Sequence, residues 1–290
     1  MRNRILAGLG VAALATVGIA VPANALSSTT ADIWVVHGVP GVEVDVYING
    51  DLAPADSGLV GFQPGEVVPL VDAAPGDYVI DINPAEASPP ATITPGDGVI
   101  TSEDIAPGGI PVAAGVSYSL VAHYNAAGDL TLSAFENDLD TVGAGQASVT
   151  ARHTAAAPAV DIVAAPDTLL FGGVENGQQG TDAVAAGEYD IEVQVAGSDP
   201  VAVAHEFPAN LAAGTHYFIH VVGNPDADAP YDTVIFTIGD SPAGVPAGSA
   251  GLAAENGAGS TGLIAGGAAL LALLIAGGVI VARRMTAEQR

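Results

Sequence analysis

Two histidine–aspartate pairs stand out because both follow the same local pattern. In the stretch VVHGVPGVEVDVYING, His37 precedes Asp45, and in TARHTAAAPAVDIVAAPD, His153 precedes Asp161. A short link that contains a proline separates each histidine from a Val-Asp step. A histidine oriented by a carboxylate can act as a general base in catalysis. The same pair can instead satisfy hydrogen bonds inside a fold, because buried polar groups need partners.

We favour the structural role for His37, Asp45, His153 and Asp161. Catalysis by a histidine base also needs a nucleophile, and the sequence contains no Gly-x-Ser-x-Gly motif. The pair occurs twice, which suits a repeated fold element better than a single active site. We therefore predict no catalytic residues and no enzymatic activity.

A third group of polar residues lies in the loop NPDADAPYD. Asp226, Asp228 and Asp232 place carboxylates at short intervals there, and Ca²⁺ takes several oxygen ligands of this kind. The loop lacks the glycine and the final glutamate of an EF-hand. A weak extracellular Ca²⁺ site is one hypothesis for these three residues, and a solvated turn is the other. No further cofactor is expected.

The charge distribution excludes one large class of function. Of the 32 acidic residues, only Glu288 lies outside residues 26–282. Arg152 is the one cation inside that stretch, so residues 26–282 carry a formal charge of −30. Nucleic-acid binding requires cations that face phosphates. We predict no nucleic-acid partner and a solvated, self-repelling surface. The sequence has no cysteine, which also removes disulfides and thiolate metal sites.

The two ends of the chain indicate where the protein sits. Residues 1–25 show two arginines, an apolar run and an Ala-x-Ala step, the pattern of a signal peptide. Residues 263–282 are twenty uncharged, mostly apolar residues, long enough for a transmembrane helix. Arg283 and Arg284 follow directly and predict a cytoplasmic tail at 283–290. We therefore predict a single-pass cell-membrane protein with an extracellular N-terminal ectodomain.

Residues 241–261 are rich in Gly, Ala, Pro and Ser and predict a flexible stalk. The order of stalk, span and basic pair resembles substrates of sortase. Ser260-Thr261-Gly262 lacks the Leu-Pro that begins a sortase signal. We therefore favour a retained transmembrane anchor over covalent attachment to the cell wall.

The ectodomain contains an internal repeat. Besides the two His–Asp pairs, APGDYVIDI (74–82) matches AAGEYDIEV (185–193), and VAAGVSYSLVA (112–122) matches LAAGTHYFIHV (211–221), in the same order. An insertion rich in Pro and Gly at 83–111 accounts for the greater length of the first copy. The sequence therefore predicts a tandem duplication over residues 31–142 and 146–240.

Each copy consists of short stretches of β-branched and aromatic residues bounded by Gly, Pro and Asp, which is typical of strands. In YDIEVQV the apolar residues alternate with polar ones, as in a strand with one buried face. In THYFIH this extended form separates His216 from His220 by ~13 Å, so they cannot share one metal. The predicted fold is all-β: two antiparallel β-sandwiches of immunoglobulin-like or transthyretin-like type, followed by one C-terminal transmembrane helix.

The start of the first copy resembles the family named domain of unknown function 4397, which opens with a strand, a histidine, a short link and Val-Asp-Val-Tyr. The matching residues are His37, Pro40, Val44, Asp45, Val46, Tyr47 and Gly50. Both His-to-Asp links are one residue shorter than in the family, and the second copy lacks the tyrosine. The resemblance implies tandem β domains on a surface protein of actinobacterial type and implies no activity.

Together these observations predict a non-enzymatic protein of the cell envelope. Its expected role is structural, adhesive or ligand-displaying, with an envelope polymer or another protein as partner. The alternative is a carbohydrate-binding or hydrolytic module that acts on envelope polymers. That alternative requires exposed aromatic residues, or histidines and carboxylates that converge in a pocket.

Overall fold

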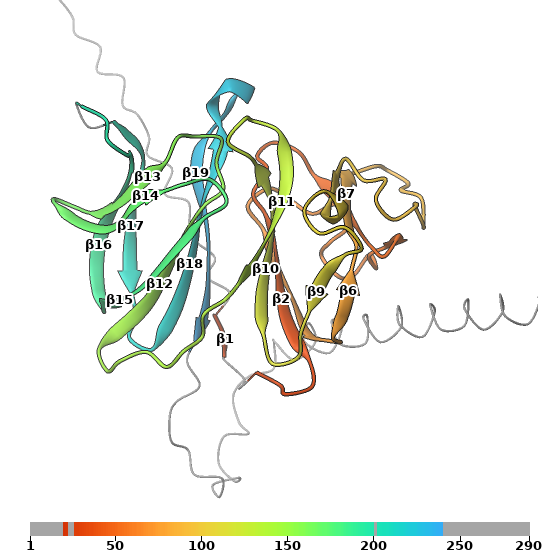
Figure 1. The fold of residues 1–290 in the computed structure, drawn as a ribbon, viewed down its shortest axis with the longest axis horizontal. Coiled ribbons are helices and arrows are strands. Elements are labelled where there is room, and N and C mark those ends of the chain that lie inside the picture. The colour runs from red at the N-terminus through yellow and green to blue at the C-terminus, as the bar shows by residue number, and fades with distance from the viewer. Residues whose placement is uncertain (1–19, 23–25, 200–201, 240–290) are drawn as a thin grey trace, which may run out of the picture.

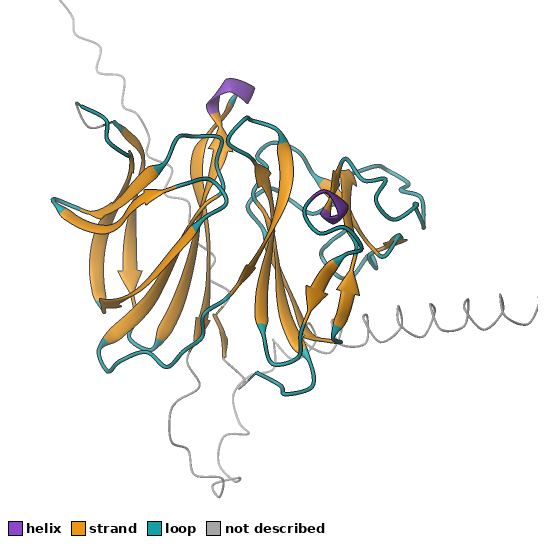
Figure 2. Ribbon diagram, viewed as in Figure 1, coloured by secondary structure: helices purple, strands orange, loops and turns teal. Residues whose placement is uncertain are grey.

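The computed structural model describes residues 20–22, 26–199 and 202–239. This part of the chain is all-β, as predicted, and its helical residues are confined to two single 3₁₀ turns, η1 (Ser102–Asp104) and η2 (Pro225–Ala227). Figure 2 shows that strands and connecting loops make up the rest. Many loops are short and turn at glycines with positive φ, as the Gly-rich spacing of the strands predicts.

The first half of the chain forms two four-stranded sheets and a small two-stranded one. The sheet with the longer strands, called the larger sheet below, has the order β11 (Leu130–Glu136), β10 (Ser117–Tyr124), β2 (Ala31–His37) and β5 (Val67–Ala73). The facing sheet has the order β4 (Asp51–Leu52), β3 (Val44–Ile48), β7 (Ile80–Pro84) and β8 (Ile100–Thr101). The third pairs β6 (Gly76–Tyr78) with β9 (Ile110–Val112).

The second half forms two sheets. The larger has the order β1 (Ala20–Pro22), β19 (Ala229–Gly239), β18 (Thr215–Asn224), β12 (Gln146–His153) and β15 (Gln179–Ala185). The facing sheet has the order β14 (Thr168–Val174), β13 (Val160–Ala164), β16 (Gly187–Val195) and β17 (Val203–Leu211). The chain passes from the first pair of sheets to the second between β11 and β12.

The prediction of purely antiparallel sheets is wrong for three pairs of strands. β1 lies parallel to β19, and one central pair in each half is parallel, β2 with β10 and β12 with β18. A parallel pair requires a long crossover connection. Residues 38–116 and 154–214 supply it, because each carries the chain through the facing sheet before it returns.

Each half has its own apolar core between its sheets. The alternation predicted for YDIEVQV is confirmed in β16, where Ile191 and Val193 are buried and Asp190 is exposed. Tyr78 and Tyr189 occupy matching places in the two halves. Their hydroxyls donate to the carbonyls of Ala74 and Ala185, at 2.6 Å and 2.8 Å.

A third apolar core lies between the two halves. The larger sheets face each other in the middle of the molecule, with β10 and β11 opposite β18 and β19 (Figure 1). The residues of this interface core are Trp34, Val36, Val121, Phe135, Phe218, Val222, Val234, Phe236 and Ile238. Strands β2 and β10 are therefore covered on both faces and are buried along almost their whole length. Such strands have continuous apolar runs instead of alternation, as the run Ile33–Val36 in β2 shows.

Several predicted segments fall outside the described residues: most of the leader 1–25, the stalk 241–261, the span 263–282 and the tail 283–290. Of the leader, Ala20–Pro22 is described, and it pairs parallel to Thr237–Gly239 of β19. In the part of the chain that the structure describes, no helix has the length and apolar character to cross a membrane.

Candidate functional site

His37 closes the loop that follows β2. Its Nδ1 accepts a hydrogen bond from the Val39 backbone N–H at 3.3 Å, and its Nε2 lies 2.8 Å from the Val42 carbonyl oxygen. Because Nδ1 is an acceptor, Nε2 carries the proton and the ring is neutral. Burial lowers the pKa of His37, although the Val42 carbonyl and Glu66 act in the opposite direction. The side chain is buried.

His153 makes the same contacts after β12. The Ala155 N–H donates to its Nδ1 at 3.4 Å, and its Nε2 lies 2.9 Å from the Pro158 carbonyl. The backbone N–H and C=O groups of the two histidines also make matching hydrogen bonds. In each half, both groups bond to the loop that precedes the adjacent edge strand. Burial lowers the pKa of His153 as well. The two imidazole rings therefore close equivalent loops in the two halves.

The aspartates do not pair with the histidines. The carboxylate of Asp45 accepts from the N–H of Gly61 at 2.9 Å and from that of Glu86 at 3.0 Å. The Asp161 carboxylate accepts from the Gly173 N–H at 2.7 Å. Asp45 thus ties β3 to two neighbouring loops, and Asp161 ties β13 to the adjacent strand β14.

This geometry leaves neither His37 nor His153 free to act as a general base. Both ring nitrogens of His37 and of His153 are bonded to the backbone, so neither presents a free lone pair to a substrate. A general base must lie within hydrogen-bond reach of the proton it removes. The contacts support the structural interpretation of the four residues.

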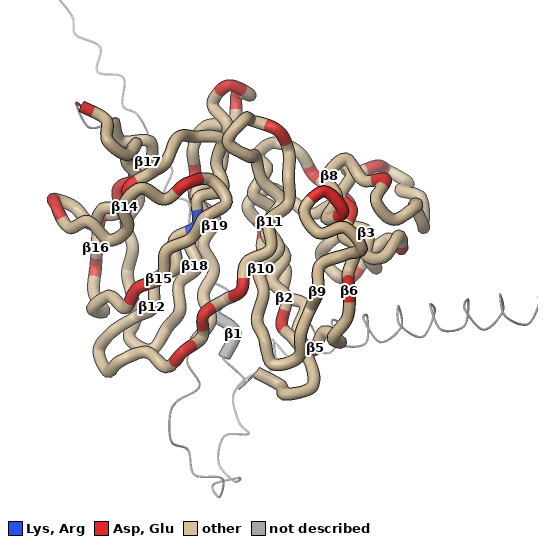
Figure 3. The backbone as a smooth tube through the Cα atoms, in the orientation of Figure 1, with Lys and Arg blue, Asp and Glu red and all other residues tan. Residues whose placement is uncertain are grey.

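Arg152 is the polar residue whose environment sequence reasoning missed. It is the one cation of the described residues, and Figure 3 shows acidic residues spread over both halves around it. Its side chain is 0% exposed. Its Nε donates to Gln179 Oε1 at 2.9 Å, its Nη2 to Asn137 Oδ1 at 2.7 Å, and its Nη1 lies 3.1 Å from His220 Nε2. None of these partners is a carboxylate.

Two aromatic rings complete the environment of this guanidinium. Its central carbon lies 4.7 Å from the ring centroid of Phe135 and 5.1 Å from that of Phe218. The rings come from different halves, so the cation–π contacts join the two halves. Burial lowers the pKa of Arg152 to about 9, which leaves the group charged at neutral pH. A lone arginine inside a strand of an acidic chain was the available sequence signal.

Two further buried histidines lie near this contact, His220 beside the guanidinium and His123 close enough to His220 to lower its pKa. His220 stands one strand away on β18, and its Nδ1 lies 3.3 Å from the Val234 carbonyl. His123 stands on β10, with Nδ1 2.8 Å from the Tyr124 carbonyl and Nε2 2.8 Å from Ser133 Oγ. Burial lowers the pKa of His123 to about 4 and holds that of His220 well below its usual value.

The acidic loop does not form the Ca²⁺ site that we raised as a hypothesis. Asp226 lies in η2 and Asp228 ends it with a φ of 57°, both exposed. Asp232 lies on β19, where its carboxylate is 3.7 Å from His205 Nε2. In residues 26–199 and 202–239, no three carboxylate or histidine side chains gather in a way that could hold a metal. The chain turns sharply at Asp228, and the carboxylate of Asp232 lies near the His205 side chain of β17 instead.

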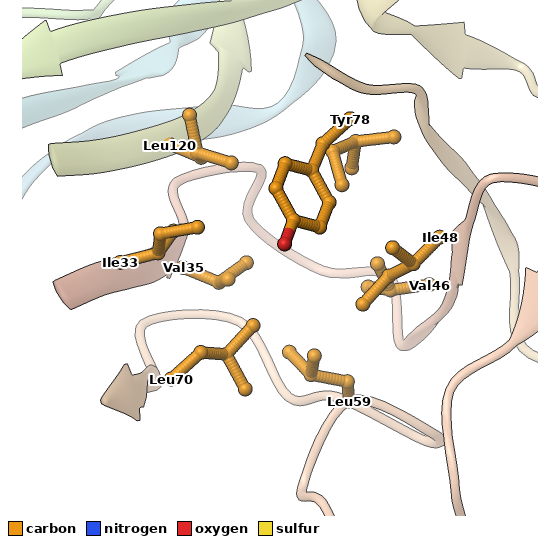
Figure 4. A pocket seen from close by; sticks show the side chains of 9 residues that line it. Ile33, Val35, Val46, Ile48, Leu59, Leu70, Tyr78 and Leu120 are labelled. Atoms are coloured by element: carbon orange, nitrogen blue, oxygen red, sulfur yellow. The ribbon is translucent and has the colours of Figure 1, made fainter. Parts of the chain in front are cut away.

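The first half encloses a small apolar cavity between its two sheets. Figure 4 shows side chains from both sheets, among them Val35, Val46 and Leu120, pointing into it around the ring of Tyr78. Its volume is about 10 Å³, close to the least that holds one water molecule. Its lining has no polar surface. The cavity is a packing gap with no room for a ligand.

The histidine, link and Val-Asp-Val-Tyr segment is thus a structural motif that joins the two sheets of one half. Residues 31–163 match the family model Domain of unknown function (DUF4397). The match supports the family resemblance and covers less than half of the 290 residues. It begins with β2 and ends in β13, so it contains His37, Asp45, Arg152, His153 and Asp161.

Other comparisons add little to the DUF4397 match. No curated protein matches the sequence. One solved structure, "The Bacillus anthracis TIE protein", is similar over 67% of this chain at 8% identity, with a TM-score of 0.21. The similar region spans 34% of that chain, so this protein corresponds to about a third of its length.

Proposed function

We propose that the protein is a secreted, membrane-anchored surface protein whose ectodomain acts as a rigid, non-enzymatic β module. The role is structural, adhesive or ligand-displaying at the cell envelope. The observation that carries the non-enzymatic part is the bonding of both repeated histidines to backbone, which leaves neither ring available to a substrate.

A tandem duplication of one DUF4397-type domain is part of the proposal. The order β11-β10-β2-β5 in the first half corresponds to β19-β18-β12-β15 in the second. The matched tyrosines in VAAGVSY and LAAGTHY have the same bond, because Tyr118 Oη accepts from Ala113 N–H and Tyr217 Oη from Ala212 N–H. Equivalent hydrogen bonds at equivalent places support a repeat of one structure.

The rigid character of the module is supported by the interface core. Trp34 of the first half stacks on Phe236 of the second, and Arg152 contacts an aromatic ring from each. A large, hydrophobic interface holds two domains in a fixed arrangement. A surface module of this kind presents its far end at a constant distance from the stalk.

The surface location rests on sequence. The signal-peptide pattern, the apolar span at 263–282 and the basic pair Arg283–Arg284 support an envelope protein with its ectodomain outside. The actinobacterial type is what the DUF4397 resemblance implies. The stretch of 31 acids and one cation supports a solvated ectodomain that an anionic polymer does not bind directly. The partner is therefore a neutral or cationic group, or a protein.

Protease treatment of intact cells tests the topology. The chain carries one epitope tag after Leu26 and a second after Arg290. We expect external protease to remove the first tag and to leave the second on a short membrane fragment. Loss of the second tag with protection of the first would reverse the orientation. An N-terminus still at Met1 would exclude a cleaved signal peptide.

Hydrolysis assays test the alternative function. The full-length protein is incubated with isolated envelope glycan, and the release of reducing ends is measured for the wild type and for His37→Ala and His153→Ala. We expect no turnover by any of them. Turnover that disappears in a variant whose melting temperature is unchanged would show that the protein is an enzyme.

A further inference from the structure

Three side chains form a basic cluster inside the contact between the two halves. His123 comes from β10 of the first half, and Arg152 and His220 come from β12 and β18 of the second. All three are buried. His220 lies against the guanidinium at 3.1 Å. His123 is close enough to His220 and to His153 for their charges to disfavour one another.

The groups around His220 on every neighbouring strand are neutral or positive. Arg152 of β12 faces its Nε2, the Val234 carbonyl of β19 faces its Nδ1, and the Phe236 ring of β19 stacks on it at 5.8 Å. His123 of β10, a strand that contacts β18, is close enough for its charge to lower the pKa of His220. His216 lies further along β18 itself and is buried.

The surroundings of His123 and Arg152 have the same character. Ser133 of β11, the Tyr124 carbonyl, the Thr154 backbone and His153 of β12 surround His123. Asn137, Gln179, Phe135 and Phe218 complete the contacts of Arg152. In the described part of the chain, no carboxylate bonds to either residue or contributes to the shifted pKa of His123, Arg152 or His220.

Protonation of this cluster has a direct cost. His220 Nε2 accepts a hydrogen bond from the guanidinium, so a proton on that nitrogen removes the bond and places two donors face to face. The new positive charge then lies next to Arg152 in a dry environment without a counter-ion, where charges repel strongly. When the halves separate, water solvates all of these groups. Acid therefore favours the separated state.

We propose that the contact between the two halves is an acid-sensitive switch, in which protonation of His220 beside Arg152, and of His123 near His220, separates the halves while each half keeps its own sheets. The two sandwich cores contain neither histidine, and they remain closed around their own apolar residues. Separation exposes the apolar faces of the larger sheets, including Trp34 and Phe236. This inference does not depend on the function proposed above.

The range of pH follows from linkage. Consider a histidine that stays neutral in the closed state and has its ordinary pKa of about 6.5 in the open state. For each pH unit below that value, it lowers the ratio of closed to open molecules up to tenfold. Two such histidines lower the ratio up to 100-fold per unit. The pKa of His123 in the closed state is about 4, so we expect the midpoint between these two values.

The chain contains its own probe of this contact. Trp34 is the single tryptophan of all 290 residues, and it is buried at the interface, stacked on Phe236. The experiment titrates the full-length protein in neutral detergent from pH 7.5 to 3.5 and follows Trp34 emission, its quenching by acrylamide, and far-UV circular dichroism. We expect the emission to move to longer wavelength and quenching to rise at a higher pH than that at which the strand signal is lost.

A distance measurement gives an independent readout. The chain has no cysteine, so Asp56→Cys in the first half and Asp199→Cys in the second place one dye on each half at exposed positions. Energy transfer between the dyes should fall in the same pH range as the Trp34 signal changes. It should recover when the pH is returned to 7.5.

Variants assign the effect to the cluster. His123→Gln with His220→Gln keeps neutral hydrogen-bonding groups and removes both titrating sites, so the Trp34 midpoint should fall by one pH unit or more. His205→Gln is the matched control, because His205 lies outside the interface core and is partly exposed. The control should leave the midpoint unchanged.

Three results would overturn the proposal. The first is coincidence of the Trp34 and strand transitions in the wild type, which would mean simple acid unfolding. The second is an unchanged midpoint in the double variant. If that variant fails to fold, NMR titration of the wild-type histidines tests the proposal instead. The third result is protonation of His123 and His220 in that titration with no change in Trp34 emission.

Discussion

The indole ring of Trp34 stacks on the phenyl ring of Phe236, with ring centroids 4.8 Å apart and planes 15° from parallel. One residue lies on the first strand of the first half, and the other lies on the last strand of the second. Phe236 also stacks on Phe218 at 4.9 Å. This column of rings makes the two halves one unit, and it lies next to the buried Arg152.

The first prediction concerns that column. Trp34→Ala should destabilise the protein by about 3–5 kcal/mol, because it removes a large buried ring and leaves a cavity. Trp34→Phe should cost much less. It keeps the stack on Phe236 and removes the indole N–H, which is buried and has no hydrogen-bond partner among the described residues. Chemical denaturation followed by circular dichroism measures both. Equal losses for the two variants would contradict the stacking argument.

The second prediction concerns the two loop closures. His37→Ala and His153→Ala should each lower stability by about 1–3 kcal/mol, since each leaves a buried backbone N–H, that of Val39 or of Ala155, without its partner. His205→Ala is the control and should change stability by less than about 1 kcal/mol. Thermal melts of the three variants provide the test. Unchanged melts for His37→Ala and His153→Ala would remove their structural role.

The third prediction is a loss of stability in acid, with its sign set by burial. The folded-state pKa of His123 is lowered from 6.5 to about 4, so the unfolded chain binds more protons between these values. Stability is therefore complete above pH 6.5 and falls as the pH drops toward 4. This one residue contributes on the order of 3 kcal/mol. Urea denaturation at a series of pH values measures the slope, and His123→Gln should reduce it. A slope that is the same in His123→Gln would be contrary evidence.

The fourth prediction concerns Arg152. Arg152→Ala should cost about 3 kcal/mol or more, because it empties a packed space and removes the donor to Gln179 Oε1 and one of the two donors to Asn137 Oδ1. Arg152→Met should cost less, since an apolar chain of similar length fills the space between Phe135 and Phe218 without the desolvation of a charge. Denaturation of both variants checks the order. A larger loss for methionine than for alanine would contradict the packing argument.

The fifth prediction concerns cations. The melting temperature should rise with NaCl, because salt shortens the Debye length from ~10 Å at 0.1 M to ~3 Å at 1 M and screens the acidic surface. Millimolar Ca²⁺ should add nothing beyond its ionic strength, because the carboxylates of the η2 loop do not gather. The joint variant Asp226→Asn and Asp228→Asn is the control. A Ca²⁺ effect in the wild type that this variant loses would restore the metal site.

The sequence by itself determined the local features. Alternation of apolar and polar residues identified strands such as β16, because side chains on a strand point to opposite faces at every step. The repeated His–link–Val-Asp pattern identified a fold element in advance of its hydrogen bonds. Its partners were not predictable, because the Gly61 and Glu86 N–H groups that bind Asp45 come from loops distant in sequence.

Only the tertiary structure decided how the halves meet. The run Ile33–Val36 in β2 is buried, yet no local pattern names the second sheet that covers it. The parallel pairing of β2 with β10 and the burial of Arg152 also depend on residues far apart in the chain. The physical reason is that burial and hydrogen-bond partners are set by which faces come together. Sequence periodicity reports only that a face is apolar.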